Sequence, residues 1–204
     1  MDYLDSTKKE IRERWFENHK VKSIEGNEGL QRIVWGEEGT RMYQVNYVLA
    51  GNMVFVAGDL GDAAYELTCA ATLENIKDFN LSYFTGKLTA SQRDKYDFDD
   101  KLAREQIESD FKSWCEVDSV GELDEETKEL YEELIGETHE WNRCDHFQNG
   151  VYAIYNNTSV DWFDSEYASS IADNGQRLSR CFIAYWIGLQ MIIEQFESQK
   201  EVSA

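Results

Sequence analysis

An apolar strand and a glycine–aspartate turn stand together in residues 52–65, which read NMVFVAGDLGDAAY. Residues 53–57 are continuously apolar, a pattern typical of a strand in the middle of a sheet. Residues 58–62, GDLGD, follow at once and predict a tight turn, because glycine adopts positive φ and aspartate hydrogen-bonds the backbone. Residues 63–67 can then form a returning strand.

Further strands are expected on the N-terminal side of this stretch. Residues 30–35 are expected to form a short strand, and the glycine-flanked loop 36–39 is typical of a hairpin. Residues 41–49 alternate between two faces, as a half-buried strand does. The sequence therefore predicts an α+β fold in which a three- or four-stranded antiparallel sheet, at about residues 30–67, is packed by helices.

Helical periodicity dominates the rest of the chain. The clearest case is residues 178–196, where apolar side chains recur at the spacing of a buried helix face, so we expect a buried C-terminal helix. We predict three parts: a charged N-terminal helix at residues 1–24, a single α+β domain at residues 25–198, and a polar tail at residues 199–204.

Charge is the unusual property of the composition. The chain has 40 acidic and 20 basic residues, a net charge of −20. A field of that sign repels nucleic acid and anionic membranes and attracts basic surfaces. We therefore expect a basic protein partner, with no membrane association and no direct DNA binding. The charged first residues predict no signal peptide, so we expect the protein in the cytoplasm, with its four cysteines as buried thiols.

The acidic residues concentrate in one region. Between residues 94 and 145 there are 19 acidic and 6 basic residues. Asp124 is a predicted N-cap of a helix that has Lys128 as its one lysine. Spaced carboxylates on a rigid scaffold can imitate a row of phosphates, whereas the alternative is a face that only keeps the protein soluble. The predicted partner-binding residues are Glu125, Glu126, Glu129, Glu132, Glu133, Glu137, Glu140, Asp97, Asp99 and Asp100.

The N-terminal segment is the one stretch where basic residues match acidic ones. Four of them, Lys8, Lys9, Arg12 and Arg14, are candidates for a contact with RNA.

Two groups of residues could carry chemistry. Asp59 and Asp62 at a strand end could hold Mg²⁺, although such sites usually recruit a further carboxylate and a lysine. The alternative is that both aspartates stabilise the structure of the turn together with Gly58 and Gly61. Cys144 and His146, with His139 upstream, lack the paired spacing of a zinc site. We therefore predict no metal site, no cofactor and no catalytic residues.

The glycine–aspartate stretch resembles a family of small proteins of bacteriophages and mobile elements. The shared features are a V-x-G-D-L-G-D-A-x-Y core, here within residues 52–65, and an F-x-x-x-Y-F segment, here residues 79–84, followed by Lys87 and Ser91. The resemblance covers roughly residues 28–115 and supplies no catalytic residues. Its setting is similar to that of type II-A anti-CRISPR proteins.

The resemblance implies a counter-defence role in a bacterial host. The expected function is a non-catalytic inhibitor that binds Cas9, or its guide-RNA complex, and blocks nucleic-acid binding with an acidic surface. Two alternatives stay open. One is a metal-dependent nuclease that cleaves guide RNA through Asp59 and Asp62, and the other is an acidic structural or regulatory phage protein.

Overall fold

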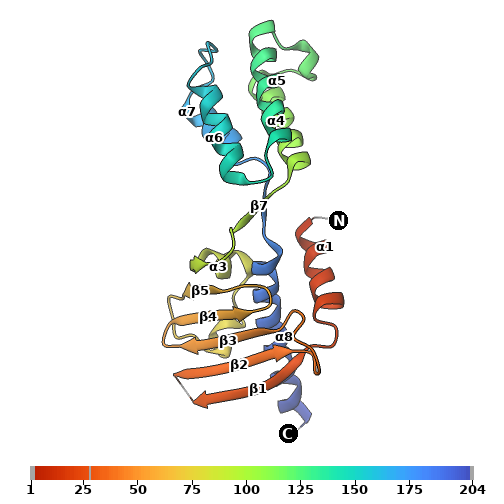
Figure 1. Ribbon diagram of the computed structural model, residues 1–204, viewed down its shortest axis with the longest axis vertical. Coiled ribbons are helices and arrows are strands. Elements are labelled where there is room, and N and C mark those ends of the chain that lie inside the picture. The colour runs from red at the N-terminus through yellow and green to blue at the C-terminus, as the bar shows by residue number, and fades with distance from the viewer. Residues whose placement is uncertain (1–2, 28, 203–204) are drawn as a thin grey trace. The chain divides into compact units, whose positions relative to one another are not determined.

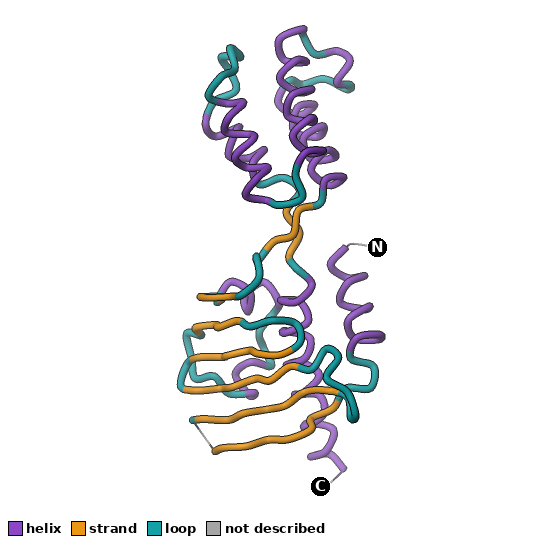
Figure 2. Tube along the Cα trace, viewed as in Figure 1, coloured by secondary structure: helices purple, strands orange, loops and turns teal. Residues whose placement is uncertain are grey.

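The computed structural model describes residues 3–27 and 29–202, and the chain divides into two compact units. We call residues 1–95 together with 179–204 the sheet unit, and residues 96–178 the helical unit. Helices and strands both contribute (Figures 1 and 2), so the predicted α+β class is confirmed. The sequence predicts a single domain at residues 25–198, whereas residues of that range fall into both units, and each unit has its own buried core.

The sheet unit contains a six-stranded antiparallel sheet in which every strand pairs with its neighbours in sequence. The strands are β1 (Lys20–Asn27), β2 (Leu30–Gly36), β3 (Val45–Ala50), β4 (Met53–Gly58), β5 (Ala63–Glu66) and β6 (Leu88–Ser91). The predicted sheet at about residues 30–67 corresponds to β2–β5, and β1 and β6 extend it at its two edges.

The N-terminal helix is shorter than predicted. Helix α1 spans Tyr3–Glu10 and continues as a π-helix, η1, over Ile11–Trp15, while residues 20–27 belong to β1. β1 is an edge strand of mostly exposed residues, in which the polar Ser23 is half-buried and the apolar Ile24 is 42% exposed, so its residue types do not show the alternation of a half-buried strand. Residues 1–2, part of the predicted helix, lie outside the described residues.

One face of the sheet packs against α8 (Arg180–Val202), which runs behind the sheet in Figure 1. Ile183, Leu189 and Ile192 of α8 are fully buried, which confirms the buried C-terminal helix. The short helices α2 (Leu73–Ile76) and α3 (Leu81–Gly86) also contact α8. The predicted polar tail was placed too early, because α8 stays helical to residue 202; residues 203–204 lie outside the described residues.

Polar contacts fasten the N-terminal helix to α8. The Arg12 guanidinium donates two hydrogen bonds to the Glu194 carboxylate, at 2.7 and 2.8 Å, and these bonds raise the pKa of Arg12. Arg180 pairs with Glu10 at 3.2 Å, and the ammonium of Lys8 lies 5.7 Å from the centre of the Trp186 ring. The basic character of the N-terminal segment therefore serves in part to hold this helix in place.

The helical unit lies between β6 and α8 in the chain. It contains α4 (Asp100–Trp114), the 3₁₀ turn η2 (Val120–Glu122), α5 (Glu125–Glu140), α6 (Cys144–Tyr155) and α7 (Ser165–Ala172). Its ends pair as two short antiparallel strands, β7 (Tyr96–Phe98) and β8 (Gln176–Leu178). The boundaries between the two units, at residues 95–96 and 178–179, cannot be recognised from the sequence. An amphipathic helix has the same spacing of apolar residues whichever core it packs against.

Gly188 of α8 allows a close contact between this helix and the sheet. The hydroxyl of Tyr47, a fully buried residue of β3, donates a hydrogen bond of 2.9 Å to the carbonyl oxygen of Tyr185. A Cβ atom at position 188 would collide with that hydroxyl oxygen. The absence of a side chain at this position therefore sets how closely α8 approaches β3.

We predict that Gly188→Ala lowers the free energy of unfolding by about 1–3 kcal/mol, the usual cost of overpacking a core. Tyr47→Phe removes the colliding oxygen, so the double variant should lose less stability than the two single losses combined. Urea unfolding of all three variants measures this. Gly136→Ala on α5 is the matched control, because open space surrounds that position and alanine favours the helix. Strict additivity of the two single effects would contradict the proposed contact.

Candidate functional site

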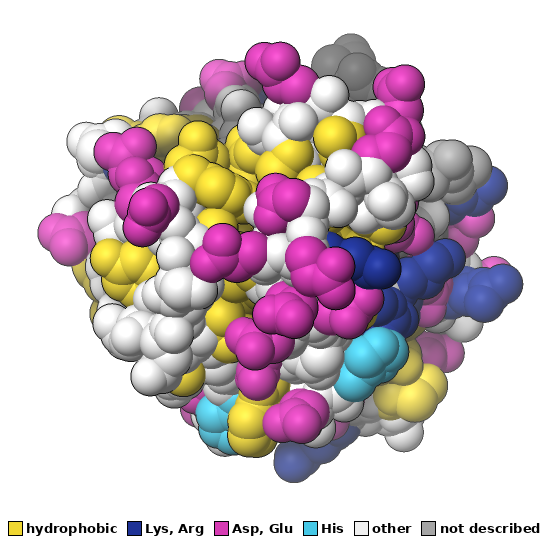
Figure 3. All heavy atoms as spheres, turned by 90° about the horizontal axis from the view of Figure 1, so that it is seen from above, with side chains coloured by type: hydrophobic (Ala, Val, Ile, Leu, Met, Phe, Trp, Pro, Cys, Tyr) yellow, Lys and Arg dark blue, Asp and Glu magenta, His cyan; other side chains and the backbone are white. Residues whose placement is uncertain are grey.

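The negative charge of the protein is concentrated in the helical unit. Residues 96–178 contain 22 acidic and 6 basic residues, an excess of 16 in a chain whose net charge is −20. Figure 3, a view turned by 90° from that of Figure 1, shows acidic side chains spread over much of the visible surface. The sheet unit, by contrast, is close to balanced.

Helix α5 provides the most regular array of carboxylates. The Asp124 carboxylate caps the helix by accepting a hydrogen bond of 2.9 Å from the backbone N–H of Thr127, as predicted, and that bond lowers the pKa of Asp124. Leu130 and Leu134 are buried and orient the helix. Successive residues turn by about 100°, so the glutamates at positions 125, 129, 132, 133 and 140 lie within roughly one third of the helix circumference.

We call this set of five the acidic face: Glu125, Glu129, Glu132, Glu133 and Glu140. All five side chains are exposed, and within the described residues none of them forms an ion pair. Like charges three and four positions apart on a helix are unfavourable, by about 0.2–0.5 kcal/mol per pair. Glu125 lies in the first turn, where the helix dipole favours a carboxylate, but the repulsion among the other four is not offset by an ion pair within the described residues.

The other predicted carboxylates of α5 have partners inside the helical unit. Glu137 accepts a hydrogen bond of 2.6 Å from the indole N–H of Trp141, and Glu126 accepts one of 2.6 Å from the Ser159 hydroxyl. Both can still contribute charge, but their side chains are held in place by these bonds.

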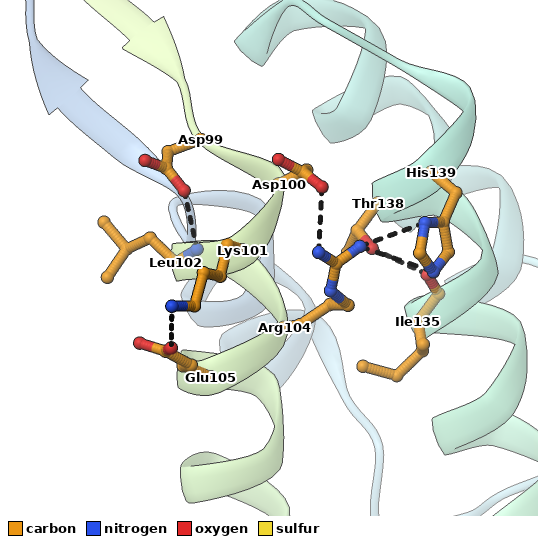
Figure 4. Close-up of polar contacts among 9 residues, drawn as sticks. All are labelled: Asp99, Asp100, Lys101, Leu102, Arg104, Glu105, Ile135, Thr138 and His139. Atoms are coloured by element: carbon orange, nitrogen blue, oxygen red, sulfur yellow. Dashed lines mark hydrogen bonds and ion pairs between the residues drawn. The ribbon is translucent and has the colours of Figure 1, made fainter.

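Asp99 and Asp100 have structural tasks at the start of α4 (Figure 4). Asp99 caps the helix through the backbone N–H of Leu102 at 2.8 Å and pairs with Arg177 of β8 at 2.8 Å. Asp100 pairs with Arg104 at 2.9 Å, and Arg104 donates to Nδ1 of His139 on α5 at 3.0 Å. These contacts join α4 to β8 and to α5. Asp97 on β7 is exposed.

The candidate RNA-contacting residues are not equally available. Lys8 and Arg12 are engaged with Trp186 and Glu194 of α8. Lys9 lies 4.0 Å from Glu13 of the same helical segment, and Arg14 is exposed. A basic patch on this helix would therefore depend on Lys9 and Arg14.

The glycine–aspartate turn has a structural task. Gly58 and Gly61 have φ values of 154° and 104°, and a Cβ at Gly58 would collide with the carbonyl oxygen of Gln44. The Asp59 carboxylate accepts a hydrogen bond of 2.9 Å from the backbone N–H of Tyr43, outside the turn itself. Asp59 therefore anchors the loop that precedes β3, while Asp62 is exposed.

Among the described residues, no three His, Cys, Asp or Glu side chains are grouped in a way that could hold a metal ion. Cys144 donates to the carbonyl oxygen of Tyr96 at 3.7 Å, His139 contacts Arg104, and the His146 ring lies edge-on to Trp141 at 5.3 Å.

The prediction of four buried cysteines holds for Cys181 alone; the thiols at positions 69, 115 and 144 are partly exposed.

Tyr43 joins three segments of the sheet unit, which the sequence did not predict. Its φ of 55° is positive, its ring stacks on Trp15 at 4.7 Å, and its carbonyl oxygen lies 3.2 Å from Nε2 of His19. A carbonyl only accepts, so His19 donates from Nε2. Nδ1 of His19 is buried and has no hydrogen-bond partner among the described residues.

The environment of His19 predicts an effect of acid on stability. Burial lowers the pKa of His19 below 6.5, although the bond to Tyr43 and the charge of Glu37 oppose the shift. Neutral His19 therefore stabilises the fold fully above pH 6.5, and that contribution is lost as the pH falls through the folded-state pKa.

We predict that the free energy of unfolding falls more between pH 7.5 and 5.0 for the wild type than for His19→Gln, whose amide can still donate to Tyr43. Urea unfolding at both pH values measures the difference, and the exposed His146→Gln serves as the control. Identical pH dependence in the wild type and His19→Gln would show that His19 does not titrate as described.

No protein-family model, curated protein or solved structure matches this chain. Within residues 3–27 and 29–202, none of the helices combines the length and the apolar character needed to cross a membrane.

Proposed function

We propose that this protein is a non-catalytic binding protein whose acidic face docks on the basic, nucleic-acid-binding surface of a partner protein. The observation that carries the proposal is the acidic face itself: five exposed glutamates on one side of α5, without ion pairs among the described residues and with like charges three and four positions apart. Complementary charge on a partner would relieve that repulsion and speed the encounter.

The arrangement suits the imitation of nucleic acid. Carboxylates that recur along a rigid helix present a row of negative charge, as phosphates do along a strand, and α5 is held by its own buried residues rather than by the partner. The resemblance of residues 52–65 to proteins of phages and mobile elements points to a counter-defence role. Cas9, or its guide-RNA complex, is the partner that we propose.

The test is a charge reversal with a matched control. We predict that Glu129→Lys, Glu132→Lys and Glu133→Lys together leave the melting temperature unchanged or raise it, because repulsion within α5 is removed, and weaken Cas9 binding at least tenfold. The control reverses three exposed carboxylates of the sheet unit, Glu17, Glu66 and Asp78, which gives the same change in net charge.

Binding is measured by pull-down and calorimetry with Cas9, with and without guide RNA, at several salt concentrations. Wild-type affinity should fall steeply with salt because the complex depends on charge. Equal affinity of the two triple variants would exclude the acidic face as the binding surface. If the wild type fails to bind under every condition, the proposal of Cas9 as the partner is wrong.

A second experiment separates binding from nuclease activity. In the structure Asp59 is hydrogen-bonded to Tyr43, a role that asparagine can keep through its amide oxygen. We predict that the double variant Asp59→Asn, Asp62→Asn still inhibits Cas9, and that EDTA leaves inhibition by the wild type unchanged. Loss of inhibition under both treatments, in a protein that melts like the wild type, would favour a metal-dependent nuclease instead.

A further inference from the structure

The sheet face opposite α8 carries a small polar cleft. Ile33 and Tyr47 point toward α8 and are fully buried. Their neighbours Arg32 and Asn46 point the other way, because side chains alternate along a strand, and the helices of this unit leave that side open (Figure 1). Strands β2, β3 and β4 and the loop that precedes β3 enclose a cleft of about 330 Å³ there, a size at the lower end of small-molecule sites. The residues that line it are Arg32, Arg41, Gln44, Asn46, Gly58 and Asp59.

Two guanidinium groups supply hydrogen-bond donors to this cleft. Arg41 is exposed and forms no ion pair among the described residues. Arg32 uses Nη1 for an ion pair with Glu25, at 3.1 Å from both carboxylate oxygens, which leaves Nε and Nη2 to donate elsewhere. That pair is exposed, and exposed ion pairs are weak. Two guanidinium groups that line one cleft match the charge and the several oxygens of a phosphate group.

The loop that carries Arg41 and Gln44 is fixed to the end of β4. The backbone N–H of Asp59 donates to the carbonyl oxygen of Gln44 at 3.0 Å, and the Asp59 carboxylate accepts from the N–H of Tyr43 at 2.9 Å. The ammonium of Lys22 donates to Oε1 of Gln44 at 3.3 Å, so the amide nitrogen of Gln44 remains to donate to a ligand. The cleft is therefore formed before a ligand arrives, which lowers the entropic cost of binding.

Asn46 adds an acceptor without a partner. Its Nδ2 donates to the carbonyl oxygen of Ala57 at 3.1 Å, and this bond fixes the orientation of the amide because a carbonyl only accepts. Oδ1 of Asn46 is buried and has no hydrogen-bond partner among the described residues. Buried polar atoms in proteins are almost always hydrogen-bonded, so this oxygen in the lining of a cleft points to a ligand that donates. A hydroxyl group donates, whereas a carboxylate only accepts.

The acidity of the whole chain does not exclude an anion from this cleft. The sheet unit has 18 acidic and 14 basic residues, so its own charge is nearly balanced. At physiological salt, exposed charges act over about 8 Å, and the arginines that line the cleft outweigh more distant carboxylates. Asp59 is the acidic residue of the lining, and its carboxylate favours a ligand hydroxyl over a phosphate oxygen.

We propose that this cleft binds a phosphorylated sugar, either free or as part of a nucleotide. The phosphate lies on Arg32 and Arg41, and sugar hydroxyls donate to Asn46 and Asp59. The proposal goes beyond the proposed function, because the cleft belongs to the sheet unit and shares no residue with the acidic face. Each proposal can therefore fail without the other.

The test is isothermal titration calorimetry of the full chain with ribose 5-phosphate, AMP, inorganic phosphate and glutarate. We expect saturable binding of ribose 5-phosphate and AMP, and the tighter of the two identifies the source of the sugar phosphate. Inorganic phosphate should bind more weakly because it lacks the sugar hydroxyls. Glutarate should bind most weakly because its carboxylates cannot donate to Asn46.

Variants locate the binding. Arg41→Gln should weaken the binding of ribose 5-phosphate at least tenfold, because charge-assisted hydrogen bonds are lost. Arg14→Gln is the matched control, since it removes the same charge from an exposed arginine outside the cleft, and it should bind like the wild type. Asn46→Leu should reduce the preference for ribose 5-phosphate over inorganic phosphate.

Three outcomes would overturn the proposal. The wild type could show no saturable binding of either sugar phosphate at millimolar concentrations. Inorganic phosphate or glutarate could bind as tightly as ribose 5-phosphate, which would exclude a site for a sugar phosphate. Arg14→Gln could weaken binding as much as Arg41→Gln, which would reveal unspecific attraction by charge. Melting temperatures establish folding of the variants, and Arg41→Lys, which keeps the charge but loses the planar group, repeats the test if Arg41→Gln does not fold.

Discussion

The packing of α8 against one face of the sheet is the constraint on which the rest of the structure depends. Gly188 permits the approach, Tyr47 fills the space and bonds the helix backbone, and Leu189 and Ile192 complete the core. The same helix fastens the N-terminal segment through Glu194 and Trp186. Because α8 comes at the end of the described chain, the sheet unit can close only after the helical unit has been synthesised. Its core therefore joins segments far apart in sequence.

The division into two units separates two kinds of surface. The sheet unit has nearly balanced charge, whereas the helical unit carries an excess of 16 acidic residues over its basic ones. A dense array of like charges destabilises the element that bears it. In this protein the array lies on α5. The opposite side of α5 carries Leu130 and Leu134, which are buried in the core of the helical unit, and this burial offsets the repulsion among the carboxylates.

Several residues that sequence reasoning marked for function instead hold the structure together. Asp99 caps α4 and pairs with Arg177, Asp59 anchors the loop at Tyr43, and Arg12 is bound to Glu194. In each case a charged group satisfies backbone donors or an opposite charge within its own unit. Of the predicted partner-binding carboxylates, those without such a contact among the described residues are the glutamates of the acidic face and the exposed Asp97.

Local sequence patterns were sufficient for the strands at residues 30–67, the cap at Asp124 and the buried face of α8, because each follows from the period of nearby side chains. They were not sufficient for β1, where polar Ser23 is half-buried while apolar Ile24 is exposed, or for the boundary at residue 96, where helical periodicity does not reveal which core a helix joins. The composition also established that the protein is acidic and rich in aromatic residues. Which carboxylates are free, and that one face of the sheet is left open, depend on contacts between residues distant in sequence, and those contacts exist only in the folded chain.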